Sequence, residues 1–172
     1  MTKISDFHKR LILEQAGKFG VEPALIAAIC QRESDFNADA MRLEDGYRWL
    51  WRVGENAGRL KITFRTEEKL QSFSYGLMQL MGATARSCGF LEPLPVLLDP
   101  QKNLEFGCRY LMSLFDRFGK LGKNVEAGWC DAVVAAYNAG SPRRVNNLKF
   151  VNEGYVRAVE GFYKEFATGD FK

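Results

Sequence analysis

Along most of this chain the apolar residues recur every three to four positions, which is the spacing that places them on one face of an α-helix. The clearest stripe lies in the segment 99–118 and consists of Leu104, Cys108, Leu111, Leu114 and Phe115. Start signals such as Ser5 and Pro23, and stop signals such as Gly119, flank the periodic segments. The chain is therefore predicted to be mainly α-helical, with helices at about residues 5–17, 22–34, 66–71, 77–87, 99–118, 126–138 and 152–166.

The helical periodicity is lost between about residues 35 and 74, a segment rich in Gly, Trp, Arg and Glu with one short candidate helix. We expect strands, a lid or an inserted lobe there, with an irregular inserted segment at about 40–74. The rest of the 172 residues shows no internal repeat, no low-complexity segment and no clear domain boundary. That length suits one domain, so residues 1–172 are predicted to form a single domain that carries this inserted lobe or lid.

The composition, with 47% hydrophobic and 26% charged residues, is that of an ordinary soluble globular protein. The net charge of +3 suits an anionic polymer such as cell wall or nucleic acid, without choosing between them. The strongest basic cluster, Arg143-Arg144, is more typical of residues that flank a turn, so no nucleic-acid partner is expected. The N-terminal segment lacks the apolar stretch of a Sec signal peptide, and no apolar run is long enough for a membrane span.

Four cysteines and a single histidine offer poor ligands for a metal. None of the cysteines forms a CxxC pair, and His8 is the only histidine, so the spacing of a structural zinc site is missing. Cys30 and Cys108 lie within apolar helical patterns and are predicted to be buried free thiols, with one disulfide bridge as the open alternative. His8 is expected to be an exposed residue of the first helix.

Glu33 is the first candidate for chemistry, because it continues an apolar helix face instead of lying opposite to it. Residues three and four apart share a helix face, and the residues behind Glu33 on this face are Leu25, Ile26, Ile29 and Cys30. A carboxyl group held against apolar surface has a raised pKa, since its charged form is disfavoured. A raised pKa is what a general acid needs at neutral pH. The alternative is a Glu at a helix end that faces solvent or pairs with Arg32.

Two further segments place polar side chains in apolar surroundings. Gln79 follows Gly76 in an otherwise apolar run, where it would bond either a sugar or the local backbone of a core helix. Tyr137 and Asn138 end the apolar rows of the segment 129–138. Asn138 and Gly140 equally suit an ordinary helix end, with Gly140 in a left-handed turn.

These segments belong to blocks that together resemble the soluble lytic transglycosylase family, which has the lysozyme-like fold and is related to goose-type lysozyme. Residues 33–40 are similar to the family signature ES-x-FN-x-x-A, and residues 76–85 to its GLMQLM-x-x-TA block. Residues 103–111 match NL-x-x-G-x-x-YL, residues 135–140 match AAYNAG, and Tyr155-Val156 with Val159 resembles the last helix. All of the blocks occur in the family's order over residues 19–163.

The resemblance implies a mainly α, lysozyme-like domain in which Glu33 is the single catalytic acid/base. The matched positions that it implies for substrate binding or support are Ser34, Met78, Gln79, Tyr137, Asn138 and Tyr155. Met78 and Gln79 would line the sugar cleft, Tyr137 would orient near Glu33, and Tyr155 would lie close by. The partner would be the peptidoglycan glycan strand, with no metal and no cofactor, and we expect a monomer. The site of action would be the bacterial cell wall, in the periplasm or outside the cell.

The mechanism that the resemblance implies uses one carboxyl group and help from the substrate, an exception among glycosidases. Glu33 would protonate the glycosidic oxygen between N-acetylmuramic acid and N-acetylglucosamine, while the N-acetyl oxygen stabilises the sugar cation. Glu33 would then remove the proton of the muramic C6 hydroxyl, which attacks C1 and leaves a 1,6-anhydro end.

The chain departs from the family's pattern in two places. The connection from Glu33 to Gly76 is much longer than usual, and Phe73-Ser74 stands where Gly-Ala usually precedes the second block. In the extra segment Tyr47, Trp49 and Trp51 are possible substrate-binding residues that would stack on sugars. The alternative is that the two tryptophans form the core of a folded lobe. A phage-encoded or secretion-system enzyme would fit both the insertion and the missing signal.

Other functions remain open at this stage. A hydrolytic, goose-type-like lysozyme would need water at the site, and Glu44, Asp45 and Glu55 are candidates for a second carboxylate that activates it. A non-catalytic glycan-binding module on the same fold is a rival of another class. A metal-dependent wall amidase is disfavoured by the single histidine, and a Cys–His wall peptidase would need His8 to reach a cysteine.

Overall fold

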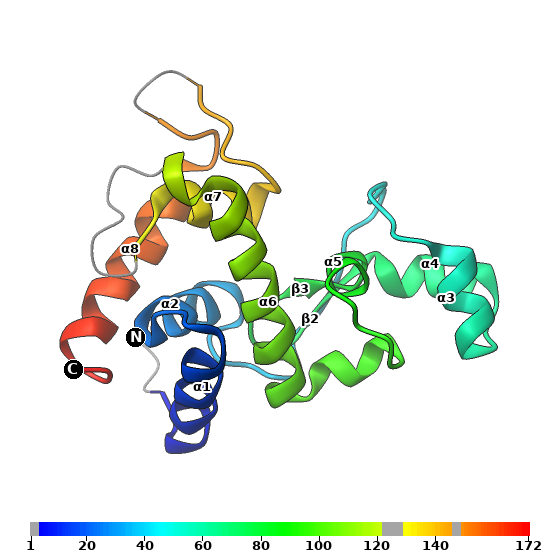
Figure 1. Cartoon of the computed structure of the whole chain (residues 1–172), viewed down its shortest axis with the longest axis horizontal. Helices are drawn as coiled ribbons and strands as arrows, with labels where there is room; N and C mark the ends of the chain where they lie inside the picture. The colour runs from blue at the N-terminus through cyan, green and yellow to red at the C-terminus, as the bar shows by residue number, and fades with distance from the viewer. Residues whose placement is uncertain (1–3, 122–128, 146–148) are drawn as a thin grey trace.

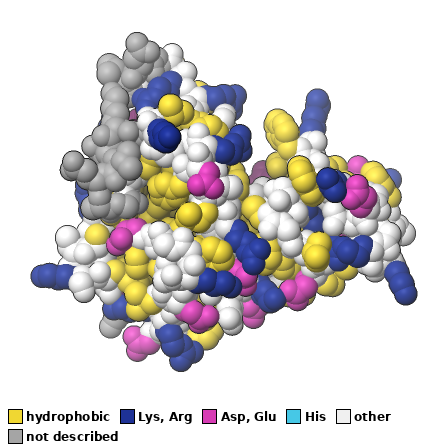
Figure 2. Space-filling view, in the orientation of Figure 1, with side chains coloured by type: hydrophobic (Ala, Val, Ile, Leu, Met, Phe, Trp, Pro, Cys, Tyr) yellow, Lys and Arg dark blue, Asp and Glu magenta, His cyan; other side chains and the backbone are white. Residues whose placement is uncertain are grey.

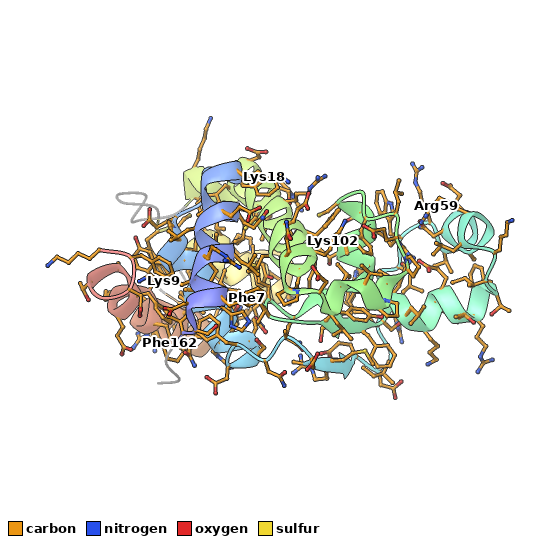
Figure 3. All side chains as sticks on the ribbon, turned by 90° about the horizontal axis from the view of Figure 1, so that it is seen from below. Phe7, Lys9, Lys18, Arg59, Lys102 and Phe162 are labelled. Carbon is orange, nitrogen blue, oxygen red and sulfur yellow. The ribbon has the colours of Figure 1, made fainter. Side chains whose placement is uncertain are left out.

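Helices make up most of the fold, and they divide it into a helical body and an arm that extends to one side (Figure 1). The computed structural model describes residues 4–121, 129–145 and 149–172. The body is built from α1 (Asp6–Phe19), α2 (Pro23–Ser34), α6 (Pro100–Phe118), α7 (Asp131–Ala139) and α8 (Glu153–Thr168). The arm carries α3 (Val53–Leu60), α4 (Phe64–Gln71) and α5 (Gly82–Ser87). In Figure 3, Arg59 marks the arm, Phe162 the body, and Lys102 of α6 lies between them.

Three helices of the body, α1, α2 and α6, begin at the signals that the sequence predicted. The backbone N–H of His8 donates to the Ser5 hydroxyl at 3.1 Å, so Ser5 caps α1. Pro23 opens α2, where its missing N–H costs nothing. Asp99 caps α6 by accepting from the N–H of Lys102 at 2.9 Å. These caps satisfy backbone donors that have no partner within the helix.

Helix α2 lies at the centre of the body, because it is apolar on every side. Each of its residues from Ala24 to Cys30 is fully buried, and such a helix must be enclosed by others. It packs against α8 on one side and α1 on another, while α1 also packs against α6. Cys30 and Cys108 are buried in this core as free thiols, as predicted.

A three-stranded antiparallel sheet joins the body to the arm. Its order is β1 (Met41–Leu43), β2 (Phe73–Tyr75) and β3 (Leu80–Met81), with Arg42 opposite Ser74 and Ser74 opposite Met81. A second, smaller hydrophobic core lies beside the sheet, beneath α5 and the 3-10 turn η1 (Leu94–Leu98). Its buried members are Tyr75, Leu80, Ala85, Phe90, Leu94, Leu97 and Phe106.

The segment expected to be largely irregular is more ordered than its pattern indicated. It contains β1, the whole of α3, and α4, which begins two residues before the predicted 66–71 helix. The tryptophans do not form the core of this lobe, because Trp49 is 77% exposed and Trp51 is 43% exposed. That alternative was therefore wrong. The buried residues of α3 and α4 are instead Val53, Asn56, Ala57, Glu67 and Gln71.

The helix predicted at 77–87 is replaced by a tight loop, the short strand β3 and then α5. Gly76 (φ +67°) and Gln79 (φ +44°) both have left-handed backbones, which no α-helix can contain. A side chain at position 76 would also lie within 2.8 Å of Asn103 atoms and the Leu97 carbonyl oxygen. Helical periodicity in the sequence could not reveal this close approach, since Asn103 and Leu97 come from the later segment 94–118.

Two further predictions concern the start of the 126–138 helix and the exposure of His8. The predicted start of the 126–138 helix lies outside the described residues, and α7 begins at Asp131. His8 is half-buried rather than exposed, because its ring stacks on Phe36 with centroids 6.0 Å apart. In the described part of the chain, none of the helices combines the length and the apolar character that crossing a membrane requires.

Candidate active site

Glu33 lies in the last turn of α2, where its side chain is half-buried at the edge of the body's core. Its Oε1 accepts a hydrogen bond from the Tyr155 hydroxyl of α8 at 2.6 Å. Burial is the largest influence on its pKa, which is raised. The Tyr155 hydrogen bond and the charges of Arg32 and Arg42 partly oppose this shift, while the Glu44 charge adds to it. The raised pKa expected from the apolar stripe is therefore found.

The alternative of a solvent-facing Glu33, or one paired with Arg32, does not describe this environment. The guanidinium of Arg32 lies over the ring of Tyr155, 5.5 Å from its centroid. Tyr155 thus contacts the carboxylate through its hydroxyl and the cation through its face. Sequence reasoning placed Tyr155 close by, but it did not identify it as the direct partner of Glu33.

Three side chains from different helices hold the loop 76–79 against α2. The Ser34 hydroxyl donates to the Leu77 carbonyl at 2.7 Å, and the Tyr137 hydroxyl of α7 donates to the Met78 carbonyl at 2.8 Å. Asn103 of α6 is fully buried; its side-chain oxygen accepts from the Met78 N–H at 2.8 Å, and its amide donates to the Tyr75 carbonyl at 2.7 Å. The loop is therefore fixed on the side of Glu33.

Tyr137 is near Glu33 without bonding to it in this arrangement. Burial raises the pKa of Tyr137 far above its ordinary value, and the charge of Glu33 is the next largest cause. Its hydroxyl is used to hold Met78, so its effect on Glu33 is one of position and local charge. Asn103 was missed as a supporting residue, although it lies in a matched block. A buried polar side chain must find hydrogen-bond partners, so the position of Asn103 beside the apolar stripe of the segment 99–118 was the signal that could have found it.

Met78 does not line the cleft, contrary to expectation. Its side chain is fully buried and packs against Gly107 of α6 so closely that an added Cβ there would lie 2.2 Å from its sulfur. Gln79 does line the cleft, but its polar atoms already have protein partners. Its amide donates to the Ala40 and Gly76 carbonyls, each at 3.0 Å, and its oxygen accepts from Ser74 at 2.9 Å. Gln79 therefore bonds to nearby backbone, although not within a helix, and its contact with a sugar stays a prediction.

A cavity of about 580 Å³ lies next to this cluster, and the surface is hollowed between the body and the arm (Figure 2). Gln79, Leu80 and Met81 line it on the β3 side. The body contributes Tyr110 of α6, Tyr137 and Asn138 of α7, and the turn after α7 with Ser141 and Arg143. The inserted segment contributes Tyr47 and Trp49. The size suits a polymer segment or a small ligand.

Glu33 is not among the residues that line this cavity, whereas Tyr137, whose pKa the Glu33 charge affects, does line it. Asn138 is exposed at the cavity and accepts from the Asn152 amide at 3.0 Å. Gly140 caps α7 in a left-handed turn (φ +73°), as predicted. Trp51 lies outside the cavity lining, beneath the guanidinium of Arg52 at 5.6 Å. Of the three aromatics predicted to bind substrate in the insertion, Tyr47 and Trp49 are therefore at the cavity and Trp51 is not.

We expect Tyr155→Phe to move the alkaline limb of the pH–activity profile to higher pH. In the native protein the hydrogen bond from Tyr155 lowers the pKa of Glu33. Without this bond, in the Phe variant, the pKa of Glu33 rises further. The acid is active while protonated, and its proton is then retained to higher pH. Tyr75→Phe is the control, because the Tyr75 hydroxyl donates to the Leu70 carbonyl in the arm. A limb that stays in place, or moves to lower pH, would contradict this account.

The sequence was compared with protein-family models. One of them, the transglycosylase SLT domain, matches residues 10–154. The match spans α2 with Glu33, the loop 76–79, α6 and α7, and it ends in the first turn of α8, one residue before Tyr155. Members of this family are lytic transglycosylases that act on peptidoglycan. This chain therefore belongs to the transglycosylase SLT domain family.

Proposed function

We propose that this chain cleaves the β-1,4 bond between N-acetylmuramic acid and N-acetylglucosamine, leaving 1,6-anhydro ends, with Glu33 as acid and then base. The observation that carries the proposal is the half-buried Glu33, with its raised pKa and its short hydrogen bond to Tyr155. A carboxyl group of this kind keeps its proton closer to neutral pH than an exposed one does. Family membership supplies the substrate, the glycan strand of peptidoglycan.

The reaction needs two proton transfers, one from Glu33 to the substrate and one from the substrate back to Glu33. Glu33 gives its proton to the glycosidic oxygen, and the bond from that oxygen to C1 breaks. The substrate's N-acetyl oxygen stabilises the charge that develops at C1. The Glu33 carboxylate then takes the proton of the C6 hydroxyl, whose oxygen bonds to C1. The carboxyl group ends protonated again, and neither water nor a metal enters the balance.

The side chains around Glu33 support this use of a single carboxyl group. The Tyr155 hydroxyl donates to the carboxylate, so it stabilises the charged form that exists between the two proton transfers. Ser34, Asn103 and Tyr137 hold the loop 76–79, and we propose that they act as positioning residues. Gln79 and Asn138 line the cavity, and we propose that they contact the strand.

Hydrolysis is the second candidate, and one observation favours it. Of the insertion carboxylates considered above, Glu44 acts on the pKa of Glu33, which places its charge within electrostatic range. A second carboxylate could activate a water molecule. However, Glu44 is paired with Arg42, with 2.5 Å between the guanidinium nitrogen and the carboxylate oxygen. This carboxylate is therefore engaged by a cation on its own segment, so we favour transglycosylation.

Mass spectrometry of the muropeptides released from purified peptidoglycan separates the two reactions. We expect products that carry 1,6-anhydro ends and are lighter by one water than the products of hydrolysis. Glu44→Gln should leave these products unchanged. Reducing ends in place of anhydro ends, lost in Glu44→Gln, would establish the hydrolytic function. If no sugar chain is cut but the strands still bind, the chain is a glycan-binding module.

A further inference from the structure

The wall of the cavity formed by the insertion is a rigid aromatic platform. Trp49 lines the cavity yet is 77% exposed. Its ring meets the Tyr47 ring edge to face, with centroids 5.5 Å apart. An apolar ring of this size gains free energy when a ligand covers it. A Trp that is held at a cavity and left uncovered is therefore a candidate surface for stacking on a sugar ring.

The chain on both sides of Trp49 is anchored. On one side, Tyr47 is half-buried and interacts with the side chain of Thr84 on α5. On the other side, the Trp51 N–H donates to the Gln71 side-chain oxygen at 2.7 Å, and the Gln71 amide donates back to the Trp51 carbonyl at 2.9 Å. Because the segment is fixed at both ends, little conformational entropy is lost when a ligand binds Trp49.

The opposite wall offers a positive charge. Arg143 is exposed and is the single charged residue among the described residues that line the cavity. Its backbone is fixed, since its N–H donates to the Ser141 carbonyl at 2.9 Å and its carbonyl accepts from the Val151 N–H at 3.0 Å. The neighbouring Arg144 is used internally, over the Phe150 ring at 4.0 Å. The Arg143 guanidinium is thus positioned to bind an anion in the cavity.

We propose that Tyr47, Trp49 and Arg143 form a subsite for a sugar that bears a stem peptide, with the ring on Trp49 and a peptide carboxylate on Arg143. The occupant rests on the proposed function, since peptidoglycan is the polymer in which sugars carry carboxylate-bearing peptides. A neutral sugar chain would use the aromatic wall alone. Guanidinium groups bind carboxylates through two parallel hydrogen bonds, so Arg143 adds both affinity and selection for the peptide. Trp49 of the insertion thereby holds the sugar ring, and Arg143 makes the enzyme prefer peptide-bearing strands.

Calorimetry and kinetics with two soluble substrates test this subsite. One substrate is a set of glycan strands that carry stem peptides, and the other is the same strands after the peptides have been removed. We expect Trp49→Ala to raise KM about tenfold on both substrates, with kcat little changed. We expect Arg143→Gln to raise KM about tenfold on peptide-bearing strands and to have no effect on bare strands. Phe64→Ala and Arg65→Gln, both exposed on α4 outside the cavity lining, are the matched controls.

Binding of the same strands to Glu33→Gln variants separates the subsite from the reaction. If this chain proves not to cleave peptidoglycan, the loss of binding in Trp49→Ala and Arg143→Gln still supports the subsite. If it cleaves as proposed but both variants bind peptide-bearing strands like their parent, the subsite is wrong and the function stands. An Arg143→Gln effect of equal size on both substrates would overturn peptide recognition.

Discussion

Glu33→Gln is expected to abolish cleavage of peptidoglycan while the protein stays folded. One acid/base group contributes on the order of 10²–10⁴ in rate, and in this site the same group serves both proton transfers. Gln keeps the shape of the side chain and can still accept a hydrogen bond from the Tyr155 hydroxyl. Its amide, however, is not acidic enough to protonate the glycosidic oxygen. The measurement is release of soluble muropeptides from purified cell wall, with circular dichroism to confirm the fold.

The same variant should be more stable than its parent at neutral pH. The pKa of Glu33 in the folded protein is raised above its ordinary value of 4.5. The folded state then binds the proton more tightly than the unfolded state, so the ionised carboxylate reduces stability at higher pH. Gln removes this cost. The gain should be fully present above the folded pKa, should shrink as the pH falls from that pKa towards 4.5, and should be absent below 4.5.

Glu165→Gln is the matched control, because Glu165 is an exposed carboxylate near the end of α8. It makes the same chemical change far along the helix from Tyr155, and we expect neither activity nor stability to respond. Substantial cleavage by Glu33→Gln would remove Glu33 from the mechanism. A stability gain that grows as the pH falls would show that the carboxyl group is not held against apolar surface.

Arg86→Met is expected to lower the free energy of unfolding by about 3–5 kcal/mol, the usual result of leaving one partner of a buried ion pair alone. Glu67 of α4 and Arg86 of α5 have fully buried side chains, with 2.7 Å between Nε and Oε1 and 3.1 Å between the second nitrogen and oxygen. Arg86 also donates to the carbonyls of Phe90 and Glu92, at 2.8 and 2.7 Å. The variant loses all of these bonds and buries an unpaired carboxylate.

Urea unfolding of three variants would separate the charge from the other bonds of Arg86. In the double variant Glu67→Leu with Arg86→Met, no buried charge remains, so part of the loss should be recovered. Recovery should stay incomplete, since the two carbonyls are still without their donor. Arg52→Met, which breaks the exposed pair with Glu55, should change little. A loss in Arg86→Met as small as that in Arg52→Met would contradict this account.

The helical body and the acid were accessible to sequence reasoning, because both depend on local spacing. The stripe behind Glu33 needs only the helical repeat, and that repeat predicts a half-buried carboxyl with a raised pKa, as observed. The caps at Ser5 and Asp99 are likewise local, since each bonds to a backbone N–H three residues away. The order of the sequence blocks indicated the family, and the family-model match over residues 10–154 confirms it.

The inserted segment was harder to predict, because its stability comes from distant partners. The helix α4 has only two buried residues, Glu67 and Gln71, and both are polar. Their partners are Arg86 and the backbone of Trp51. No apolar stripe marks such a helix in the sequence. The same holds for Trp49, whose exposure at the cavity depends on how the chain is anchored on either side.

The sequence by itself determined the helices of the body, the buried thiols and the apolar helix face beside Glu33. Each of these follows from the spacing of residues a few positions apart. Only the tertiary structure decided that Tyr155 bonds to Glu33, that Met78 turns into the core, and that Tyr47 and Trp49 face the cavity. Those outcomes depend on pairs of segments far apart in the chain. Their relative placement is set by packing and by hydrogen bonds between elements, which residue spacing does not encode.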